Sequence, residues 1–180
     1  MMNRSPPEIL TITLNPAVDI STSVDRIEPV RKLRCRAEVR SAGGGGINVA
    51  RVVSRLGGSV TAVFTAGGVV GEQLKQLVAS ENVPSLALPV AGQTRESFTV
   101  VDETTKDEFR FVMPGPVLVE PEWQACEEQI GNLAKGRTYI VASGSMPSGA
   151  PADAHARIAA IAKQAGARFV VDASGPQLQA

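Results

Sequence analysis

Four consecutive glycines, Gly43 to Gly46, are followed two positions later by Asn48, and this combination could bind a polar or anionic ligand. A glycine run loses much conformational entropy on folding, so it is best tolerated where the backbone bends tightly or approaches another group closely. The apolar residues that follow have the spacing of one face of a helix: Val49, Val52, Val53 and Leu56. The glycines therefore precede a predicted helix N-terminus, where free N–H groups and the positive end of the helix dipole attract anions.

The glycine run does not match two common nucleotide-binding motifs. A P-loop carries a lysine after its last glycine and then Ser or Thr, whereas Ile47 and Asn48 stand here. A dinucleotide fingerprint has a strand directly before the glycines and a further glycine inside the helix. Asn48 occupies that place, and the segment before the glycines is basic. A flexible linker ahead of an ordinary helix stays open as an alternative.

A second candidate for ligand binding is Asp19, which follows a predicted strand at 9–14 and the Asn15-Pro16 turn. Ligands of open α/β sheets bind outside the carboxyl ends of the strands, so Asp19 could accept hydrogen bonds from ligand hydroxyls there. An aspartate that only stabilises the turn is the alternative. The single histidine, His155, is expected on the polar side of a surface helix, and we assign it no role.

The rest of the chain alternates strand and helix patterns, which is typical of a parallel sheet with helices packed on it. Further core strands are predicted at 59–64, 139–142 and 169–172, with a short strand between Pro84 and Pro89. Helices are predicted after Gly67-Gly68, from Pro121, and around Ile158 with its end at Gly166.

Four other segments alternate but do not fit the parallel sheet. Strands are predicted at 20–27 and 33–41, and a hairpin at 95–102 and 108–113. One face of the second segment carries charges: Lys32, Arg34, Arg36, Glu38 and Arg40. That face is either a solvated edge that resists aggregation or an anion site. In the hairpin, Arg95, Ser97 and Thr99 share one face, and Arg110 lies on the partner strand. The four segments could form a separate small sheet, a lid over the site.

Composition limits the class of protein. A chain of 180 residues fits one domain, and its formal net charge of zero argues against a nucleic-acid binder driven by bulk electrostatics. Cys35 and Cys126 cannot build a disulfide framework, and no apolar run approaches the length that spans a membrane. We expect a cytoplasmic protein with neither a nucleic-acid nor a membrane partner.

Five segments in series resemble the PfkB family of ribokinase-like carbohydrate kinases, most of all its branch of minor bacterial 6-phosphofructokinases. They are TITLNPAVD at 11–19, KLRC at 32–35, GGGGINVAR at 43–51, FVMPG at 111–115 and SGSMPSG at 143–149. The resemblance covers nearly the whole chain from Ile9 onward. It implies an α/β fold, a Rossmann-like three-layer α/β/α domain with a small β-sheet lid that also forms a homodimer contact. Residues 1–180 would then be a partial PfkB domain, with lid strands at about 20–41 and 95–113 inserted in the α/β core.

The resemblance also implies a role for individual residues. Asp19 would bind sugar hydroxyls, and the sugar pocket would be lined by Gly44, Gly45, Gly46 and Asn48. The 6-phosphate of fructose 6-phosphate would be held by Arg95, Arg110 and Ser145. Lys32 and Arg34 match lid cations that reach phosphate groups at or near the subunit interface. Kinases of this kind use ATP and Mg²⁺, here for the phosphorylation of fructose 6-phosphate to fructose 1,6-bisphosphate in glycolysis.

Two motifs from the second half of the family do not occur in this sequence. These are the Asn-x-x-Glu stretch linked to magnesium and the Asp-Thr-x-Gly-Ala-Gly-Asp motif, which supplies the anion hole and the catalytic base. Phosphoryl transfer needs both charge stabilisation and a base. We therefore expect the C-terminal half of the fold to be absent, no catalytic residue or metal ligand in these residues, and no kinase activity from the chain alone.

Two functions stay open on this basis. The chain is either the N-terminal part of an ATP-dependent sugar-phosphate kinase or a non-catalytic module that binds sugar phosphates or dimerises through its lid. Fructose 1-phosphate and tagatose 6-phosphate are alternative substrates. An unrelated dinucleotide-binding domain is disfavoured by Asn48 and by the basic segment before the glycines.

Overall fold

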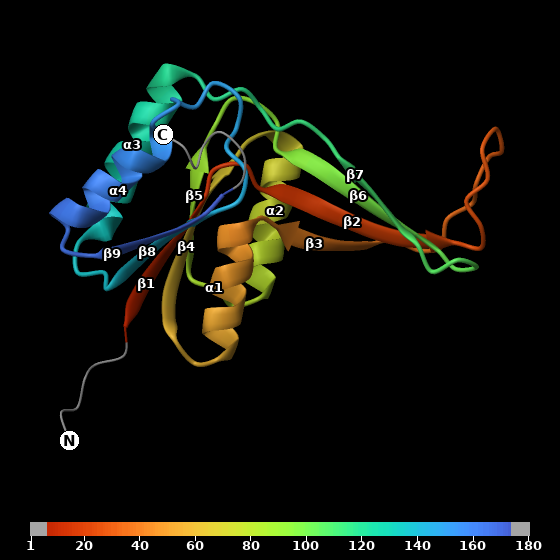
Figure 1. Cartoon of the computed structure of the whole chain (residues 1–180), viewed down its shortest axis with the longest axis horizontal. Coiled ribbons are helices and arrows are strands. Elements are labelled where there is room, and N and C mark those ends of the chain that lie inside the picture. Colours follow the sequence, from red (N-terminus) through yellow and green to blue (C-terminus); the bar gives the residue numbers. More distant parts are fainter. Residues whose placement is uncertain (1–6, 174–180) are drawn as a thin grey trace.

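The protein contains two β-sheets, and its computed structural model describes residues 7–173 (Figure 1). The larger sheet has five parallel strands in the order β5-β4-β1-β8-β9. These strands are β1 (Glu8–Thr13), β4 (Ser59–Ala66), β5 (Ser85–Pro89), β8 (Tyr139–Ser143) and β9 (Arg168–Asp172). The predicted strands of the parallel sheet are thus confirmed, to within two residues at either end.

Helices cover both faces of the parallel sheet, which gives three layers (Figure 1). They are α1 (Gly45–Arg55), α2 (Gly68–Ser80), α3 (Glu120–Ala134) and α4 (Ala154–Gln164). One core cluster joins Leu10 and Ile140 of the sheet to Trp123 of α3 and Ile158 of α4. The other cluster packs α1 and α2 against the opposite face, around Phe64. Because helices cover both faces, β4 presents apolar side chains on both of them, with Val63 in the first cluster and Phe64 in the second.

The second sheet has four strands in the order β3-β2-β6-β7 and extends away from the three layers (Figure 1). Its members are β2 (Ala17–Val24), β3 (Val39–Gly43), β6 (Arg95–Asp102) and β7 (Glu108–Val112). Strand β2 is parallel to β6, and the other two pairs are antiparallel. The predicted hairpin and separate small sheet are confirmed, and we call this sheet the lid.

The predicted strand at 33–41 is largely wrong. Of the predicted range, only residues 39–41 lie on a strand, which is the start of β3. Residues 25–38 form an exposed loop without regular structure. Its apolar positions Cys35 and Ala37 are exposed, so no packed face holds this segment in register. Arg40 alone of the predicted basic face lies on a strand.

The predicted apolar face of α1 is wrong at Val52 and Leu56, whereas Val53 packs against the core. Val52 is 54% exposed and Leu56 is 82% exposed, whereas the buried residues are Gly46, Ile47 and Ala50. A Cβ on Gly46 would lie 2.6 Å from the carbonyl oxygen of Ile12, so α1 approaches β1 through its smallest residues. Ile47 is buried beside Gly46, while Val52 and Leu56 face outward. No helix of the described chain is long and apolar enough to cross a membrane.

Candidate functional site

A cleft of about 470 Å³ lies along one face of the lid, where the lid meets the N-terminal end of α1. Most of the residues that line it are polar. They include Asp19 and Ser21 of β2, Ser41 of β3, Arg95, Ser97 and Thr99 of β6, Arg110 of β7, and Gly44 and Asn48 beside or within α1. The register explains the grouping, because Asp19 lies opposite both Ser41 and Ser97. Thr99 in turn lies opposite Arg110, so alternate residues of four strands share one face.

Asp19 lies on β2 and not in the turn where the sequence had placed it. A Cβ on Gly43 would lie 2.3 Å from one Asp19 carboxylate oxygen, so glycine at 43 leaves room for this side chain. Burial raises the pKa of Asp19 above its ordinary 3.8, and the charges of Arg110, Arg95 and Arg51 act in the opposite direction. The cleft thus holds a partly desolvated acceptor among cations.

Two arginines of the lid supply positive charge to the cleft. Arg95 donates to the carbonyl oxygen of Asn15 at 3.0 Å and to that of Met113 at 3.2 Å. Its buried Nε has no partner within residues 7–173, and burial lowers the pKa of its guanidinium. Arg110 is exposed, and no hydrogen bond or ion pair engages it in the same part of the chain. Guanidinium groups with free donors suit phosphate oxygens.

The glycines have different surroundings: Gly44 lines the cleft, whereas Gly45 and Gly46 pack against core strands. Gly44 has a φ of 129°, precedes the helix and lines the cleft. Gly45 and Gly46 lie outside the lining, against the ends of two core strands. A Cβ on Gly45 would lie 2.1 Å from the hydroxyl oxygen of Ser143. The structure therefore brings Gly44 and Asn48 to the cleft and places Gly45 and Gly46 behind it.

Ser145 lies beside the cleft and is joined to it by Asn15. The Asn15 side-chain amide donates to the Ser145 hydroxyl at 3.0 Å, while the Asn15 backbone oxygen accepts from Arg95. The sequence predicts Asn15 only as part of a turn and indicates no role for Ser21 or Ser41. Ser21 could have been predicted to lie on the same face as Asp19, because it follows Asp19 by two residues, the spacing of one strand face.

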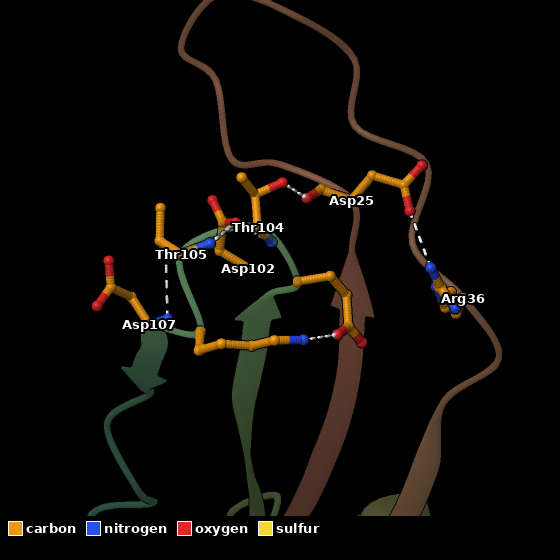
Figure 2. Close-up of polar contacts among 8 residues, drawn as sticks. Asp25, Arg36, Asp102, Thr104, Thr105 and Asp107 are labelled. Atoms are coloured by element: carbon orange, nitrogen blue, oxygen red, sulfur yellow. Dashed lines mark hydrogen bonds and ion pairs between the residues drawn. The ribbon is translucent and has the colours of Figure 1, made fainter.

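Lys32 and Arg34 lie in the exposed loop 25–38 and do not line the cleft. That loop contacts the β6–β7 turn, as Figure 2 shows around Asp25 and Thr104. The Thr104 hydroxyl donates to the Asp25 backbone oxygen at 2.6 Å, and Arg36 pairs with the Asp25 carboxylate at 2.9 Å. The carboxylate of Asp102 accepts from the backbone N–H of Ile27 at 2.8 Å. These contacts connect the basic loop to the end of the lid.

His155 is buried, with 9% of its surface exposed, so its expected place on a polar helix face is wrong. It lies beside the loop that follows β8 and lines a cavity of only about 10 Å³, too small for a sugar. Across residues 7–173, His, Cys, Asp and Glu form no cluster of three or more that could hold a metal ion.

These features were compared with known proteins. The family description "pfkB family carbohydrate kinase" matches residues 11–180. The chain belongs to the PfkB family of carbohydrate kinases. It is 46% identical over 173 residues to the ATP-dependent 6-phosphofructokinase isozyme 2 of Mycobacterium tuberculosis, a match that covers 96% of this chain and 51% of the relative. The isozyme 2 of Escherichia coli is 44% identical, with 96% of this chain and 55% of the relative covered.

Solved structures show the same PfkB fold. Phosphofructokinase-2 of Escherichia coli in complex with fructose-6-phosphate superposes with a TM-score of 0.90 at 43% identity, covering 96% of this chain and 56% of that one. Its tetrameric inhibited form gives 0.89 at the same identity and coverage. A possible 1-phosphofructokinase of Thermotoga maritima also gives 0.89, at 26% identity, covering 96% of this chain and 55% of that one. This PfkB chain spans about half the length of the curated relatives it matches. The expected ribokinase-like α/β fold with a lid is confirmed.

Proposed function

We propose that this chain supplies the sugar-phosphate-binding part of an ATP-dependent phosphofructokinase, with fructose 6-phosphate as the substrate. The observation that carries the proposal is the joint presence of Asp19, Arg95 and Arg110 in one polar cleft. The carboxylate accepts hydrogen bonds from sugar hydroxyls, and the two guanidinium groups bind phosphate oxygens. The solved complex of a 43% identical relative with fructose-6-phosphate supports the choice of ligand.

The remaining residues take supporting roles in this proposal. Asn48 contacts the sugar from the first turn of α1, and Gly44 lets the ligand approach the backbone. Ser145, fixed by Asn15, contacts the phosphate beside Arg95. Gly45 and Gly46 act through the placement of α1 and not by direct contact.

ATP and Mg²⁺ are assigned to other parts of a full-length kinase. The residues described contain neither a metal-ligand cluster nor the motif that carries the catalytic base. We expect no ATP-dependent phosphorylation of fructose 6-phosphate by the 180 residues alone. ADP release that depends on the sugar phosphate, measured with a coupled assay, would contradict this expectation.

A panel of ligands tests the substrate. Calorimetric titrations of fructose 6-phosphate, fructose 1-phosphate, tagatose 6-phosphate and fructose should show fructose 6-phosphate binding tightest. Fructose should bind at least about tenfold more weakly, because it lacks the charged hydrogen-bond acceptors. Equal affinity for fructose would exclude the phosphate role of the arginines. A preference for fructose 1-phosphate would replace the substrate and keep the cleft.

A second candidate function is a module that pairs two copies of the chain through the lid. On β7, Phe109 is 38% exposed and Phe111 is 51% exposed, and both alternate with the cleft-lining Arg110. Exposed aromatic residues on an edge strand favour association. Lys32 and Arg34 would then lie near the partner's lid. Sedimentation velocity should show a dimer that Phe111→Ser dissociates, whereas a monomeric wild type would contradict this candidate.

A further inference from the structure

Asn48 is hydrogen-bonded within its own helix by Arg51, a residue that does not line the cleft. The guanidinium Nη1 of Arg51 donates to the side-chain oxygen of Asn48 at 2.6 Å. The two residues are three positions apart on α1, a spacing that brings side chains of a helix together. Arg51 therefore contacts Asn48 without lining the cleft itself.

This contact decides which way the Asn48 amide points. Arginine has only donors, so it must face the oxygen of the amide, because the opposite orientation would place donor against donor. The amide nitrogen of Asn48, with its two hydrogens, is then free for the cleft. Asn48 can donate to a ligand oxygen there through its amide nitrogen, while Arg51 already occupies one of the two lone pairs of its oxygen.

Arg51 is itself held in place by two other elements. Its Nε and Nη2 form a fork with the carboxylate of Glu81, the residue that ends α2. Nη2 also donates to the carbonyl oxygen of Ala42 in β3 at 2.7 Å. The side chains of Arg51 and Glu81 are only 18% and 22% exposed, and a partly buried forked pair has a fixed geometry.

We propose that Arg51, anchored by Glu81, is a positioning residue that sets the Asn48 amide as a hydrogen-bond donor to a hydroxyl or phosphate oxygen of the ligand. The inference rests on the proposed function of the cleft as a sugar-phosphate site. It adds to that function a line of contacts from the end of α2, through α1, to the ligand. Arg51 thus acts on the ligand through its hydrogen bond to Asn48, in addition to the effect of its charge on Asp19.

A double-mutant cycle on the 180-residue chain tests this relation. Calorimetry would measure the fructose 6-phosphate affinity of wild type, Arg51→Met, Asn48→Ala and the double variant. Each single variant should bind about tenfold more weakly, as expected for one lost polar contact, and the double variant no more weakly than Asn48→Ala. Additive losses would show that Arg51 acts independently of Asn48 and would overturn the inference.

Two further variants separate positioning from folding. Arg55→Met removes an exposed cation one turn further along α1 and should leave affinity unchanged. Glu81→Gln keeps the shape of the anchor and should weaken binding about threefold, an effect that should vanish in the Asn48→Ala background. Should Arg51→Met fail to fold by circular dichroism, the Glu81→Gln cycle decides alone, and an effect that persists without Asn48 would contradict the positioning role.

A measurement without sugar keeps this inference apart from the proposed function. The side-chain amide signal of Asn48 in a ¹⁵N-labelled sample, assigned by its loss in Asn48→Ala, should shift in Arg51→Met and Glu81→Gln but not in Arg55→Met. Absence of sugar-phosphate binding together with these shifts would overturn the proposed function alone. Sugar-phosphate binding by wild type with an unmoved amide signal and unchanged affinity in Arg51→Met would overturn the inference alone.

Discussion

Asp19, which we propose to bind the sugar, is a carboxylate that the fold keeps partly out of water. Gly43 packs against the carboxylate, and burial raises its pKa despite three neighbouring arginines. A carboxyl with a raised pKa costs folding free energy when it ionises, so its contribution worsens as pH rises from 3.8 through the raised value. The ionised Asp19 that the proposed binding role needs therefore lowers the free energy of unfolding.

Asp19→Asn should separate these two properties. At pH 7 the variant lacks the buried charge, so its thermal unfolding midpoint should be no lower than that of wild type. Its affinity for fructose 6-phosphate should fall about tenfold or more, because a charged acceptor is lost. Below pH 3.8 both side chains are neutral, and the difference in midpoint should disappear. A lower midpoint at pH 7 would show that the arginines outweigh burial.

The residue types of the cleft were easier to predict from the sequence than the positions of those residues in the fold. Parity along 95–102 placed Arg95, Ser97 and Thr99 on one face, and the lid has them there. The sequence did not predict Asp19 on a strand, because Asn15-Pro16 indicates a turn. The next strand, β2, begins directly after it at Ala17. His155 was misplaced although it precedes Ile158 by three residues and Ala162 by seven, the spacing of one helix face, and that face of α4 is buried.

At the scale of elements, the cleft depends on how closely α1 approaches the parallel sheet. Gly45 and Gly46 allow the helix to sit on the ends of β8 and β1, which brings Gly44 and Asn48 to the lid. The sequence predicted a close approach at the glycine run but not its partner. The apolar spacing gave a wrong prediction at Val52 and Leu56, which are exposed. The buried residues of α1 are Gly46, Ile47 and Ala50.

Gly46→Ala tests this close approach. The added Cβ would lie 2.6 Å from the Ile12 carbonyl oxygen and 2.9 Å from its carbon, and a strand backbone yields little. The free energy of unfolding should fall by about 1–3 kcal/mol. Gly131→Ala in α3 is the matched control, because its Cβ would meet no atom within 4 Å. Urea denaturation should show Gly131→Ala more stable by about 0.5–1 kcal/mol, and equal losses in both variants would refute the packing argument.

At the end of β6, hydrogen bonds to Asp102 hold the lid to the loop 25–38. Asp102 is 3% exposed, and its carboxylate accepts from the backbone N–H groups of Ile27, Thr104 and Thr105. Figure 2 shows Asp102 at the end of β6, beside the loop that contains Asp25. The hydrogen bonds from Ile27 and Thr105 hold the pKa of Asp102 below its ordinary 3.8. Sequence patterns did not indicate this contact, because Ile27 and Asp102 are distant along the chain.

Asp102→Asn should loosen the loop 25–38. At pH 7 an amide accepts through one oxygen only, so we expect faster tryptic cleavage at the basic residues of that loop. In wild type the contribution of ionised Asp102 is complete above pH 3.8 and is lost as pH falls below it, through the lowered pKa. Asp107→Asn, an exposed carboxylate in the same turn, is the control and should leave the cleavage rate unchanged. Equal rates in wild type and Asp102→Asn would contradict the fastening role.

At the scale of the whole molecule, the three layers and the lid form two distinct parts (Figure 1), and residues of both line one cleft. The three-layer part supplies the N-terminal end of α1, and the lid supplies the carboxylate and the arginines. Alternation of strand and helix made the three layers predictable, because each strand is apolar and each helix is bounded by Gly or Pro. The loop 25–38 was not predictable, since its charge alternation lacks a buried face.

The most direct measurement is a calorimetric titration of fructose 6-phosphate into wild type, Arg95→Met and Arg137→Met, with circular dichroism on each sample. Arg137 is a matched cation far from the cleft lining, paired with Glu8. We predict binding by wild type and Arg137→Met, and a loss of at least about tenfold in Arg95→Met. No binding by a folded wild type, or equal affinity in Arg95→Met, would contradict the assignment of the cleft as a sugar-phosphate site.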